Sequence, residues 1–346
     1  MHLDPLPLVS VIVVNWNRRE LLRAALGSLA RQQGVAFEVI VVDNGSSDGS
    51  AEMVAEEFTS SGGAPVQLIR NRENRGFCAA NNQGIALARG EFVALLNNDA
   101  EADARWLDAL SRAFQGRGDV GMAASKILVY EDPRLIDKAG HLIYLDGQNR
   151  GRGMGLPDDG RYDRLEEALW PDGCAAMYRK QMLEQIGGFD EDFFAYGDDA
   201  ELGLRARIAG WKCLYVPEAV VRHHRGATLG RESTRRLELI ERNRVLLAVK
   251  LFPGSLLWRN WLYYLARLVA GVWASMRGAE ETSRFPGWRG KLRMAGALVR
   301  GDVQALWITP RMWRKRREVQ KIRKLSPRDV RQLLEQYRMP LGELLK

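Results

Sequence analysis

The sequence predicts an α/β fold in which a mostly parallel central sheet is covered by helices on both faces. Short apolar runs alternate with helical patterns through the first third of the chain. These runs are continuously apolar, which is typical of strands buried on both faces of a parallel sheet. Polar residues follow each run, where ligands of such sheets usually bind.

The predicted elements alternate regularly between strand and helix. Strands are expected at 8–14, 38–42, 66–69 and 92–96, and helices at 18–31, 50–58 and 77–88. Asp48 or Ser50 is expected to be the N-cap of the second helix. Further on, a helix from about residue 198 precedes a short strand at 213–216.

Charge divides the chain of 346 residues, whose net charge is +8, into two parts. Residues 1–234 contain 26 Lys and Arg against 34 Asp and Glu, and residues 235–346 contain 25 against 9. Six of the ten tryptophans lie in the second part. This division predicts an α/β domain over 1–234 and a helical, basic, Trp-rich region over 235–346.

The three cysteines, Cys78, Cys174 and Cys213, are widely spaced and lack the spacing of metal ligands. They fit small buried side chains in a reducing compartment. The first residues lack the basic start and apolar stretch of a secretory signal. The sequence therefore predicts a cytosolic protein.

Polar side chains at the ends of the four predicted strands form a rim suited to a nucleotide and its diphosphate. The turn after the first strand has no glycine, which excludes a dinucleotide fingerprint, and the chain has no P-loop. A divalent cation, Mg²⁺ or Mn²⁺, is therefore expected to neutralise the diphosphate. The candidate donor-binding residues are Asn15, Asn17, Asp43, Asn44, Asn74, Arg75, Gly76, Asn97 and Asn98.

A second polar cluster contains three carboxylates in four residues, Asp198, Asp199 and Glu201. N-capping and the helix dipole account for one carboxylate at a helix start. They do not account for the adjacent pair Asp198–Asp199, because mutual repulsion raises the pKa of at least one of them and suits a general base. The pair His223–His224 beside a glycine turn is a further functional candidate.

Six stretches resemble the family 2 inverting glycosyltransferases of the GT-A fold, and among these the bacterial rhamnosyltransferase-like branch. They occur in the family's order and cover roughly the first 230 residues. They are VSVIVVNWN (9–17), VDNGSSDGS (42–50), NRGFCAANN (74–82), LLNNDA (95–100), GGFDEDFFAYGDDAELGLR (187–205) and HHRGAT (223–228).

The resemblance implies a role for several residues. Asp43 would read the nucleotide base, Asp99 would end the metal-binding motif, and His223 would be a further metal or diphosphate ligand. Asp199 would be the catalytic base. The motif is Asn97-Asn98-Asp99, with one carboxylate where the best-known members have two or three.

The resemblance also places Trp170 and Asp172 near the acceptor, although a strand-edge turn explains them equally well. It implies a nucleotide-diphosphate sugar donor, with dTDP-rhamnose favoured and UDP- or GDP-linked galactofuranose, mannose or N-acetylhexosamine left open. The implied acceptor is a saccharide of the cell envelope or a lipid-linked saccharide. An oxocarbenium-like transition state with inversion is expected, by analogy with glycoside hydrolysis.

The basic region 235–346, called the tail below, contains an amphipathic helical pattern. Its apolar face holds Trp258, Trp261, Leu262, Leu265, Leu268, Val269, Val272, Trp273 and Met276, and its other face holds Arg259, Asn260, Arg267 and Arg277. No uncharged apolar run is long enough to span a bilayer. The pattern, with the cationic run 311–324, predicts peripheral binding to the anionic inner face of the cell membrane. Docking of this helix onto the α/β domain is the alternative.

Two further alternatives concern the loop and the charge. The turn-rich segment 151–163 is either a surface loop or a flap over the donor. A non-catalytic protein that binds nucleic acid or membrane through its basic tail is the alternative of a different class. No nucleic-acid motif appears, so no nucleic-acid partner is expected.

Overall fold

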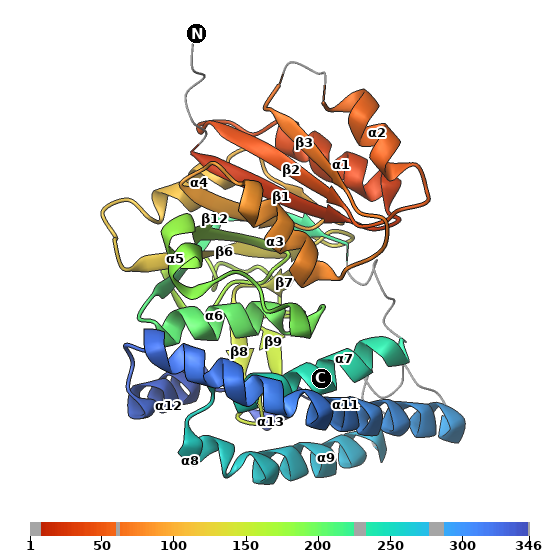
Figure 1. The fold of residues 1–346 in the computed structure, drawn as a ribbon, viewed down its shortest axis with the longest axis vertical. Coiled ribbons are helices and arrows are strands. Elements are labelled where there is room, and N and C mark those ends of the chain that lie inside the picture. The colour runs from red at the N-terminus through yellow and green to blue at the C-terminus, as the bar shows by residue number, and fades with distance from the viewer. Residues whose placement is uncertain (1–7, 60–62, 225–232, 277–286, 345–346) are drawn as a thin grey trace. The chain divides into compact units, whose positions relative to one another are not determined.

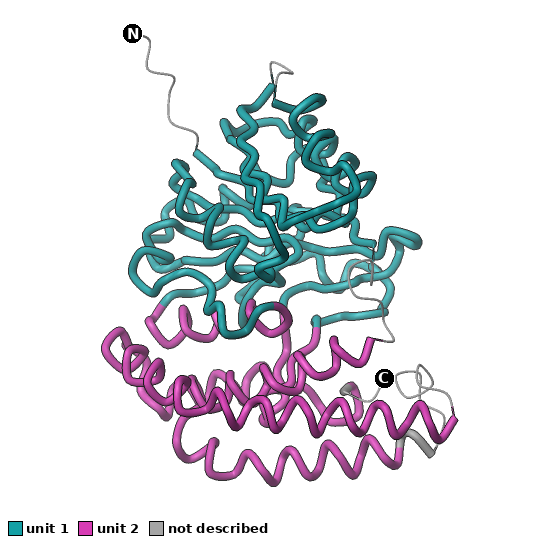
Figure 2. Tube along the Cα trace, turned by 45° about the vertical axis from the view of Figure 1, so that its right-hand side comes forward, with its two compact units in different colours: residues 1–140, 151–194, 211–225 teal, residues 141–150, 195–210, 226–346 magenta. Residues whose placement is uncertain are grey.

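The computed structural model describes residues 8–59, 63–224, 233–276 and 287–344. Residues 225–228 of the stretch HHRGAT therefore lie outside the described residues. The chain forms two compact units, coloured separately in Figure 2. Unit 1 comprises residues 1–140, 151–194 and 211–225, and unit 2 comprises residues 141–150, 195–210 and 226–346.

Unit 1 is an α/β unit (Figure 1). Its strands are β1 (Val9–Asn15), β2 (Phe37–Asp43), β3 (Val66–Arg70), β4 (Phe92–Leu96), β5 (Ala100–Ala102), β6 (Val120–Val129), β7 (Ile136–Lys138), β10 (Glu166–Ala168), β11 (Ala175–Arg179) and β12 (Lys212–His223). Its helices are α1 (Arg19–Ala30), α2 (Ser50–Glu57), α3 (Phe77–Leu87), α4 (Trp106–Arg112) and α5 (Lys180–Ile186), with a short 3₁₀ helix at Glu191–Phe193.

The sheet has the strand order β10-β12-β6-β11-β4-β1-β2-β3, with β5 paired to β12 and β7 to β6. Strands β1 to β4 pair in parallel, as do β6 and β12. Strand β11 runs antiparallel to both of its neighbours, β4 and β6. The carboxyl ends of β1, β2 and β4 therefore meet at one edge of the sheet.

Alternate residues of β1 pack against helices on opposite faces of the sheet. Val9, Val11 and Val13 belong to the core that includes the apolar side chains of α1 and α2. Ile12 faces the other way and touches Gly84 of α3, where an added Cβ would lie 2.7 Å from Ile12 Cγ2. This two-sided burial explains the continuous apolar run, and Figure 1 shows α3 on the face opposite α1 and α2.

The predicted strands and helices of the first third match the structure to within one residue at each end. The predicted N-cap of α2 is wrong, because Gly49 occupies that position with φ 80°. Asp48 still supports the helix start, since its Oδ1 accepts hydrogen bonds from Ser50 N at 3.1 Å and Ser50 Oγ at 2.5 Å. The strand expected at 213–216 extends over Lys212–His223 as β12.

The segment 151–163 is tied to the sheet of unit 1. The ammonium of Lys126, on β6, lies 2.9 Å from Asp158 Oδ1 and 2.5 Å from Asp163 Oδ1. Tyr215 OH on β12 donates to the carbonyl of Tyr162 at 2.9 Å. These contacts favour a fixed surface loop over a flap.

Unit 2 is mainly helical. It contains α6 (Asp198–Ile208), α7 (Thr234–Leu251), α8 (Gly254–Leu257), α9 (Asn260–Met276), α11 (Gly287–Ile322), α12 (Pro327–Gln336), α13 (Leu341–Leu344) and the hairpin of β8 (His141–Ile143) and β9 (Asn149–Gly151). Besides the predicted region 235–346, unit 2 includes two earlier segments, 141–150 and 195–210. They join the tail through main-chain bonds, from Lys324 N to Ile208 O at 2.9 Å and from Met339 N to Ile143 O at 2.8 Å. Among the described residues, no helix combines the length and apolarity needed to cross a bilayer.

Helices α7 and α11 pack closely because α11 presents small side chains to α7. The buried residues of α11 include Gly290, Ala297, Gly301 and Ala305. A Cβ added to Gly301 would lie 2.7 Å from Glu238 O and 2.9 Å from Glu241 Cβ, both on α7. Glycine at position 301 thus permits the close approach of the two helices.

Replacing Gly301 with alanine is expected to lower stability by about 1–3 kcal/mol, because the α7 backbone must move away. Gly296→Ala is the matched control, since its added Cβ meets only Arg300 Nη1 at 3.5 Å. That variant should be as stable as the parent or up to about 1 kcal/mol more stable, because alanine favours helix. Urea unfolding of both variants measures the difference, and equal stabilities would contradict the close-packing argument.

Candidate active site

Three side chains meet at the carboxyl ends of β1, β2 and β4. Asn15 ends β1 and lies opposite Asp43, the last residue of β2. Asn15 Nδ2 donates to Asp43 Oδ1 at 3.4 Å, and Asn98 Nδ2 donates to Asn15 Oδ1 at 2.7 Å. All three side chains are buried, with at most 8% of each residue exposed. The strand ends therefore form one hydrogen-bonded polar group.

The turn after β2 is held against the turn after β1. The backbone N–H of Asn17 donates to Ser46 Oγ at 2.9 Å, and Ser47 N donates to Asn17 Oδ1 at 2.7 Å. Asn17 has φ 52°, a left-handed conformation that asparagine tolerates. Asn17 therefore shapes the rim with both its backbone and its side chain.

Asn44 organises the loop that follows β3. Its Nδ2 donates to Asn74 Oδ1 at 3.0 Å and to Gly76 O at 3.2 Å. Its Oδ1 accepts from Asn71 Nδ2 at 3.0 Å and from Arg75 N at 3.1 Å. The side chains of Asn44 and Asn74 thus hold the loop in shape, while the Arg75 side chain is exposed.

Gly76 leads from this loop into α3 in a conformation that favours glycine, with φ 86°. A Cβ at this position would lie 2.5 Å from Phe194 Cδ2. The carbonyl of Phe194 also accepts from Cys78 N at 3.2 Å. Gly76 is therefore needed for the close approach of Phe194 to the start of α3.

Asp99 and His223 lie side by side because β5 pairs with β12. In this ladder His223 is opposite Ala100, and His224 N donates to Asp99 O at 2.9 Å. His223 Nε2 is 3.4 Å from Asp99 Oδ1, and its Nδ1 is 2.7 Å from Asp137 Oδ2. Two residues far apart in sequence are thus brought together on unit 1. The backbone of Asn97 holds the turn between β4 and β5. Its N–H donates to Cys174 O and its carbonyl accepts from Ala100 N.

Opposing effects act on the pKa of His223. Burial favours the neutral imidazole and by itself would lower the pKa, whereas hydrogen bonds to Asp137 and Asp99 raise it to about 9. A cation bound at Nε2 would displace the proton from that nitrogen, because only the neutral imidazole ligates metals.

A second ion pair joins Lys138, on the same strand as Asp137, to Asp172. Lys138 Nζ is 2.6 Å from Asp172 Oδ2, and Asp172 Oδ1 accepts from Cys174 N at 2.9 Å. Burial opposes the charge of Lys138, but the nearby carboxylates of Asp172 and Asp137 raise its pKa well above its usual range. Trp170 is fully buried. Of the two acceptor-side candidates, Trp170 therefore lies in the core, and Asp172 is held by an ion pair and a turn.

The carboxylate cluster of α6 lies on unit 2, and its members have different surroundings. Gly197, not a carboxylate, is the N-cap of α6. Glu201 is fully buried and pairs with Arg205 at 2.8 Å and Lys250 at 2.6 Å, which is a structural role. Asp198 is buried at 6% exposure.

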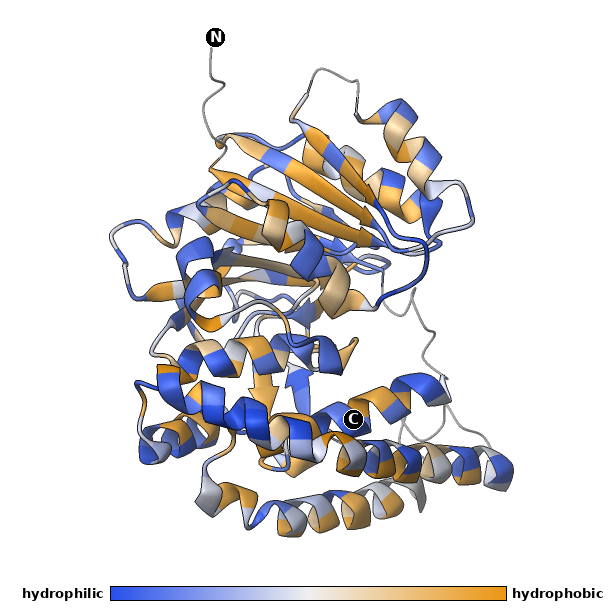
Figure 3. Ribbon diagram, viewed as in Figure 1, coloured by the Kyte–Doolittle hydropathy of each residue, from blue (hydrophilic) through white to orange (hydrophobic). Residues whose placement is uncertain are grey.

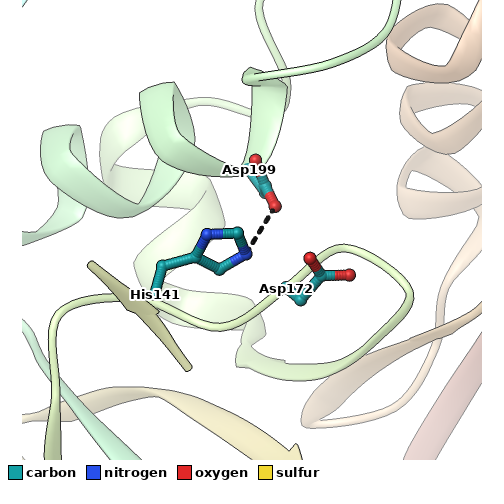
Figure 4. A group of neighbouring side chains, drawn as sticks. All are labelled: His141, Asp172 and Asp199. Carbon is teal, nitrogen blue, oxygen red and sulfur yellow. Dashed lines mark ion pairs between the residues drawn. The ribbon is translucent and has the colours of Figure 1, made fainter. Parts of the chain in front are cut away.

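Asp199 is the more exposed member of the pair, and it faces a histidine. Its Oδ2 lies 3.4 Å from His141 Nε2 on β8, as the dashed line in Figure 4 shows. Its Oδ1 accepts from Ala200 N at 2.7 Å. This arrangement fixes the carboxylate at the first turn of the helix.

Comparison with known proteins assigns the chain to a family. The model of "Glycosyl transferase family 2" matches residues 10–187, and that of "Glycosyl transferase family group 2" matches residues 161–288. The chain belongs to glycosyltransferase family 2.

Several curated relatives resemble the family 2 chain. It is 30% identical over 251 residues to the N-acetylglucosaminyl-diphospho-decaprenol L-rhamnosyltransferase of Mycobacterium tuberculosis, covering 66% of this chain and 79% of the relative. It is 30% identical over 232 residues to the O-antigen biosynthesis protein RfbC of Myxococcus xanthus, and 32% identical over 244 residues to an uncharacterised Sinorhizobium fredii protein, y4gI. The matches cover 64% and 66% of this chain, but only 18% and 26% of those two longer relatives.

Solved structures confirm the fold class. The mannosyltransferase PcManGT from Pyrobaculum calidifontis, in complex with GDP-Man and Mn²⁺, has a TM-score of 0.55 at 20% identity, with 88% of each chain covered. GalNAc-T7 with UDP, GalNAc and Mn²⁺ has a TM-score of 0.59 at 17% identity, covering 73% of this chain and 49% of the other. The predicted GT-A fold with a helical C-terminal region is thus confirmed.

The residues of this family 2 chain fit a divalent cation beside Asp99. Asp99 Oδ1 is buried and lies 3.4 Å from His223 Nε2, a longer contact than a usual charge-assisted hydrogen bond. His223 Nε2 faces this oxygen, while Asp137 holds the opposite ring nitrogen. A carboxylate on the far nitrogen is the usual support of a metal-ligating histidine. Mg²⁺ and Mn²⁺ accept such a small protein ligand set when phosphates and water complete the coordination.

Three residues that support the predicted ones were not predicted from the sequence. Asp137 holds His223, Lys138 holds Asp172, and His141 faces Asp199. All three come from the short segment 137–141. The only local signal is its density of ionisable residues beside the turn glycine Gly140, and it identifies no partner.

Proposed function

We propose that this family 2 enzyme transfers a sugar, with inversion, from a nucleotide-diphosphate donor to a saccharide acceptor of the cell envelope. The observation that carries the proposal is the joined polar group of Asn15, Asp43 and Asn98 at the strand ends, directly followed by Asp99, whose buried oxygen faces His223. Polar side chains at the strand ends suit the binding of a nucleotide. A cation nearby would neutralise its diphosphate.

Within this proposal unit 1 binds the donor. Asp43 and Asn15 contact the base or ribose, the loop held by Asn44 bounds the nucleotide, and the exposed Arg75 reaches the phosphates. Asp99 and His223 hold the divalent cation, which would stabilise the charge developing on the leaving diphosphate. Asp137 orients His223 through the 2.7 Å hydrogen bond.

Asp199 is the proposed general base. The acceptor hydroxyl has a high pKa, so a carboxylate must take its proton as the bond to the anomeric carbon forms. Of the two adjacent carboxylates, Asp199 is partly exposed and Asp198 is buried, so Asp199 is the one that an acceptor reaches. Asp198 would influence the charge of Asp199 from the neighbouring position.

The proposed donor is dTDP-rhamnose and the proposed acceptor is lipid-linked. The support is the relative named N-acetylglucosaminyl-diphospho-decaprenol L-rhamnosyltransferase, of which this chain covers 79%. A UDP- or GDP-sugar is the alternative donor, since solved structures of the same fold contain UDP and GDP-Man. A lipid-linked acceptor requires access to a membrane, so we propose a peripheral location on its inner face.

A thermal-shift series tests the donor. The protein is heated with dTDP-rhamnose, UDP-sugars or GDP-mannose, each with and without Mn²⁺, and dTDP-rhamnose with Mn²⁺ is expected to raise Tm most. A ligand at about 100 times its Kd stabilises the folded state by about 2.7 kcal/mol. Rhamnose alone and Mn²⁺ alone are the controls.

Each outcome of this series decides the donor. A larger shift with a UDP- or GDP-sugar would reassign the donor within the same enzyme class. No shift with any nucleotide sugar would contradict the proposed donor site. Proton NMR of the glycosylated product then gives the anomeric configuration, and retention would contradict the inverting mechanism.

A further inference from the structure

Helix α9 exposes its apolar side chains instead of burying them. Trp261, Val269 and Val272 are 59–63% exposed, and Trp258, just before the helix, is 79% exposed. Figure 3 shows hydrophobic residues recurring along this helix. Other side chains of α9 form, with Val269 and with α13, an open apolar groove whose lining includes Leu262, Leu265, Val269, Trp273 and Leu341. Contiguous exposed apolar surface of this kind marks a site of contact with a partner or a membrane.

The polar face of α9 packs against the rest of unit 2. Arg267 lies 2.6 Å from Asp146 Oδ2 and 2.8 Å from Glu241 Oε2, and its side chain is only 12% exposed. Asn260 donates to Asp146 O at 3.0 Å, and Tyr264 OH donates to Asp302 Oδ2 at 2.6 Å. Turning the helix to hide its apolar face would leave these buried charges uncompensated, which is strongly unfavourable. The outward apolar face is therefore built into the fold.

Helix α11 has the same arrangement on the side away from α7. Its small residues are buried, and its larger apolar residues on the opposite face are exposed: Trp288, Leu292, Val299, Val303 and Leu306. Arg289, Arg293 and Arg311 are exposed on the flank of this stripe. In unit 2, α9 and α11 run alongside each other in both views (Figures 1 and 2).

We infer that the outward faces of α9 and α11 insert into the interface of a lipid bilayer with anionic headgroups. The inference rests on the proposed membrane location and identifies the surface that provides it. Aromatic side chains beside arginines suit that interface, where rings lie at headgroup depth and guanidinium groups reach the phosphates. Arg267 lies on the predicted polar face, which packs against Asp146 and Glu241 within unit 2.

Charge favours lipid over a second copy of the chain as the occupant. Residues 235–346 contain 25 Lys and Arg against 9 Asp and Glu. Two such surfaces would repel each other, whereas an anionic bilayer attracts them. The apolar stripes then add insertion to this attraction, which salt alone does not reverse.

Vesicle flotation of the full chain tests the inference. The parent should float with phosphatidylcholine vesicles that contain phosphatidylglycerol, and much less with phosphatidylcholine alone. The double variant Val269→Glu/Val272→Glu should lower partitioning at least about tenfold, because each valine otherwise buries its side chain and each carboxylate is repelled. Arg289→Gln/Arg293→Gln should lower it about fivefold per residue on anionic vesicles only.

Leu87→Glu is the matched control, since Leu87 is 42% exposed at the end of α3 in unit 1. It introduces one glutamate, against two in the double variant, and should float like the parent. The Tm of each variant and its shift with dTDP-rhamnose show that the fold and donor site are intact. If neither the parent nor any variant shows a Tm shift with dTDP-rhamnose, but the parent still floats, the proposed donor is wrong and the proposed membrane surface is not contradicted.

Three results would overturn the inference: a parent protein that never floats, a Val269→Glu/Val272→Glu variant that floats like the parent, or a parent that sediments as a dimer and becomes monomeric in that variant without any flotation. The last result would assign the apolar face to a second copy of the chain. Sedimentation velocity of the parent and the double variant, without lipid, distinguishes it.

Discussion

Asp99→Ala is expected to abolish sugar transfer, with a loss of roughly three orders of magnitude or more. The variant removes the carboxylate whose buried Oδ1 faces His223. In the proposed mechanism the cation is then lost, and with it several kcal/mol of stabilisation of the charge on the leaving diphosphate. Donor binding, measured by calorimetry, should weaken and no longer depend on added Mn²⁺.

The matched control for Asp99 is Asp103→Ala in the same segment. Asp103 pairs with Arg222 at 2.8 Å on the surface, where both side chains are about 40% exposed. Such a surface pair contributes little to stability, so this variant should remain active. Full turnover by the parent enzyme in excess chelator would refute the metal-dependent mechanism, whatever the variants do.

Asp199→Asn should lower kcat by roughly two to four orders of magnitude, the range expected for a lost general base. The amide keeps the size of the side chain and retains an oxygen for the Ala200 N–H, so the fold and donor affinity should change little. Single-turnover kinetics with saturating donor measures the chemical step, and the thermal shift with donor reports binding.

Asp198→Asn distinguishes the two adjacent carboxylates. Asp198 is buried at the first position of α6, so its neutralisation should change the rate less than Asp199→Asn. A substantially larger loss in the Asp198 variant would assign the base to that residue. Near-normal kcat in both variants would exclude this pair as the source of the base.

Local sequence determined the first third of the fold and the rim of the site. The continuous apolar runs of β1, β2 and β4 are buried on both faces, so strand ends were predictable to within a residue. Each strand end carries its own polar residues, and parallel pairing aligns them. This is why Asn15, Asp43 and Asn98 could be expected at one place.

Long-range contacts explain what the sequence did not reveal. Asp137 meets His223 only because β7 and β12 both pair with β6, and no local pattern shows this. The orientation of α9 is another example, since its amphipathic pattern is compatible with either side facing outward. Its orientation is decided by Arg267 and Asp146, which lie 121 positions apart in sequence. Asp146 belongs to a hairpin that the sequence pattern did not predict.

The hydrogen bonds of Asn44 restrict which residue types can replace it. Its amide nitrogen gives two hydrogen bonds and its oxygen receives two, so every bonding position of the side chain is used. Aspartate has the same shape but would turn an acceptor toward two oxygens, and serine is too short to reach both partners. Asparagine is the only side chain of that length which offers both a donor and an acceptor group. We therefore expect fewer amino-acid substitutions to be tolerated at position 44 than at the neighbouring exposed positions of the rim.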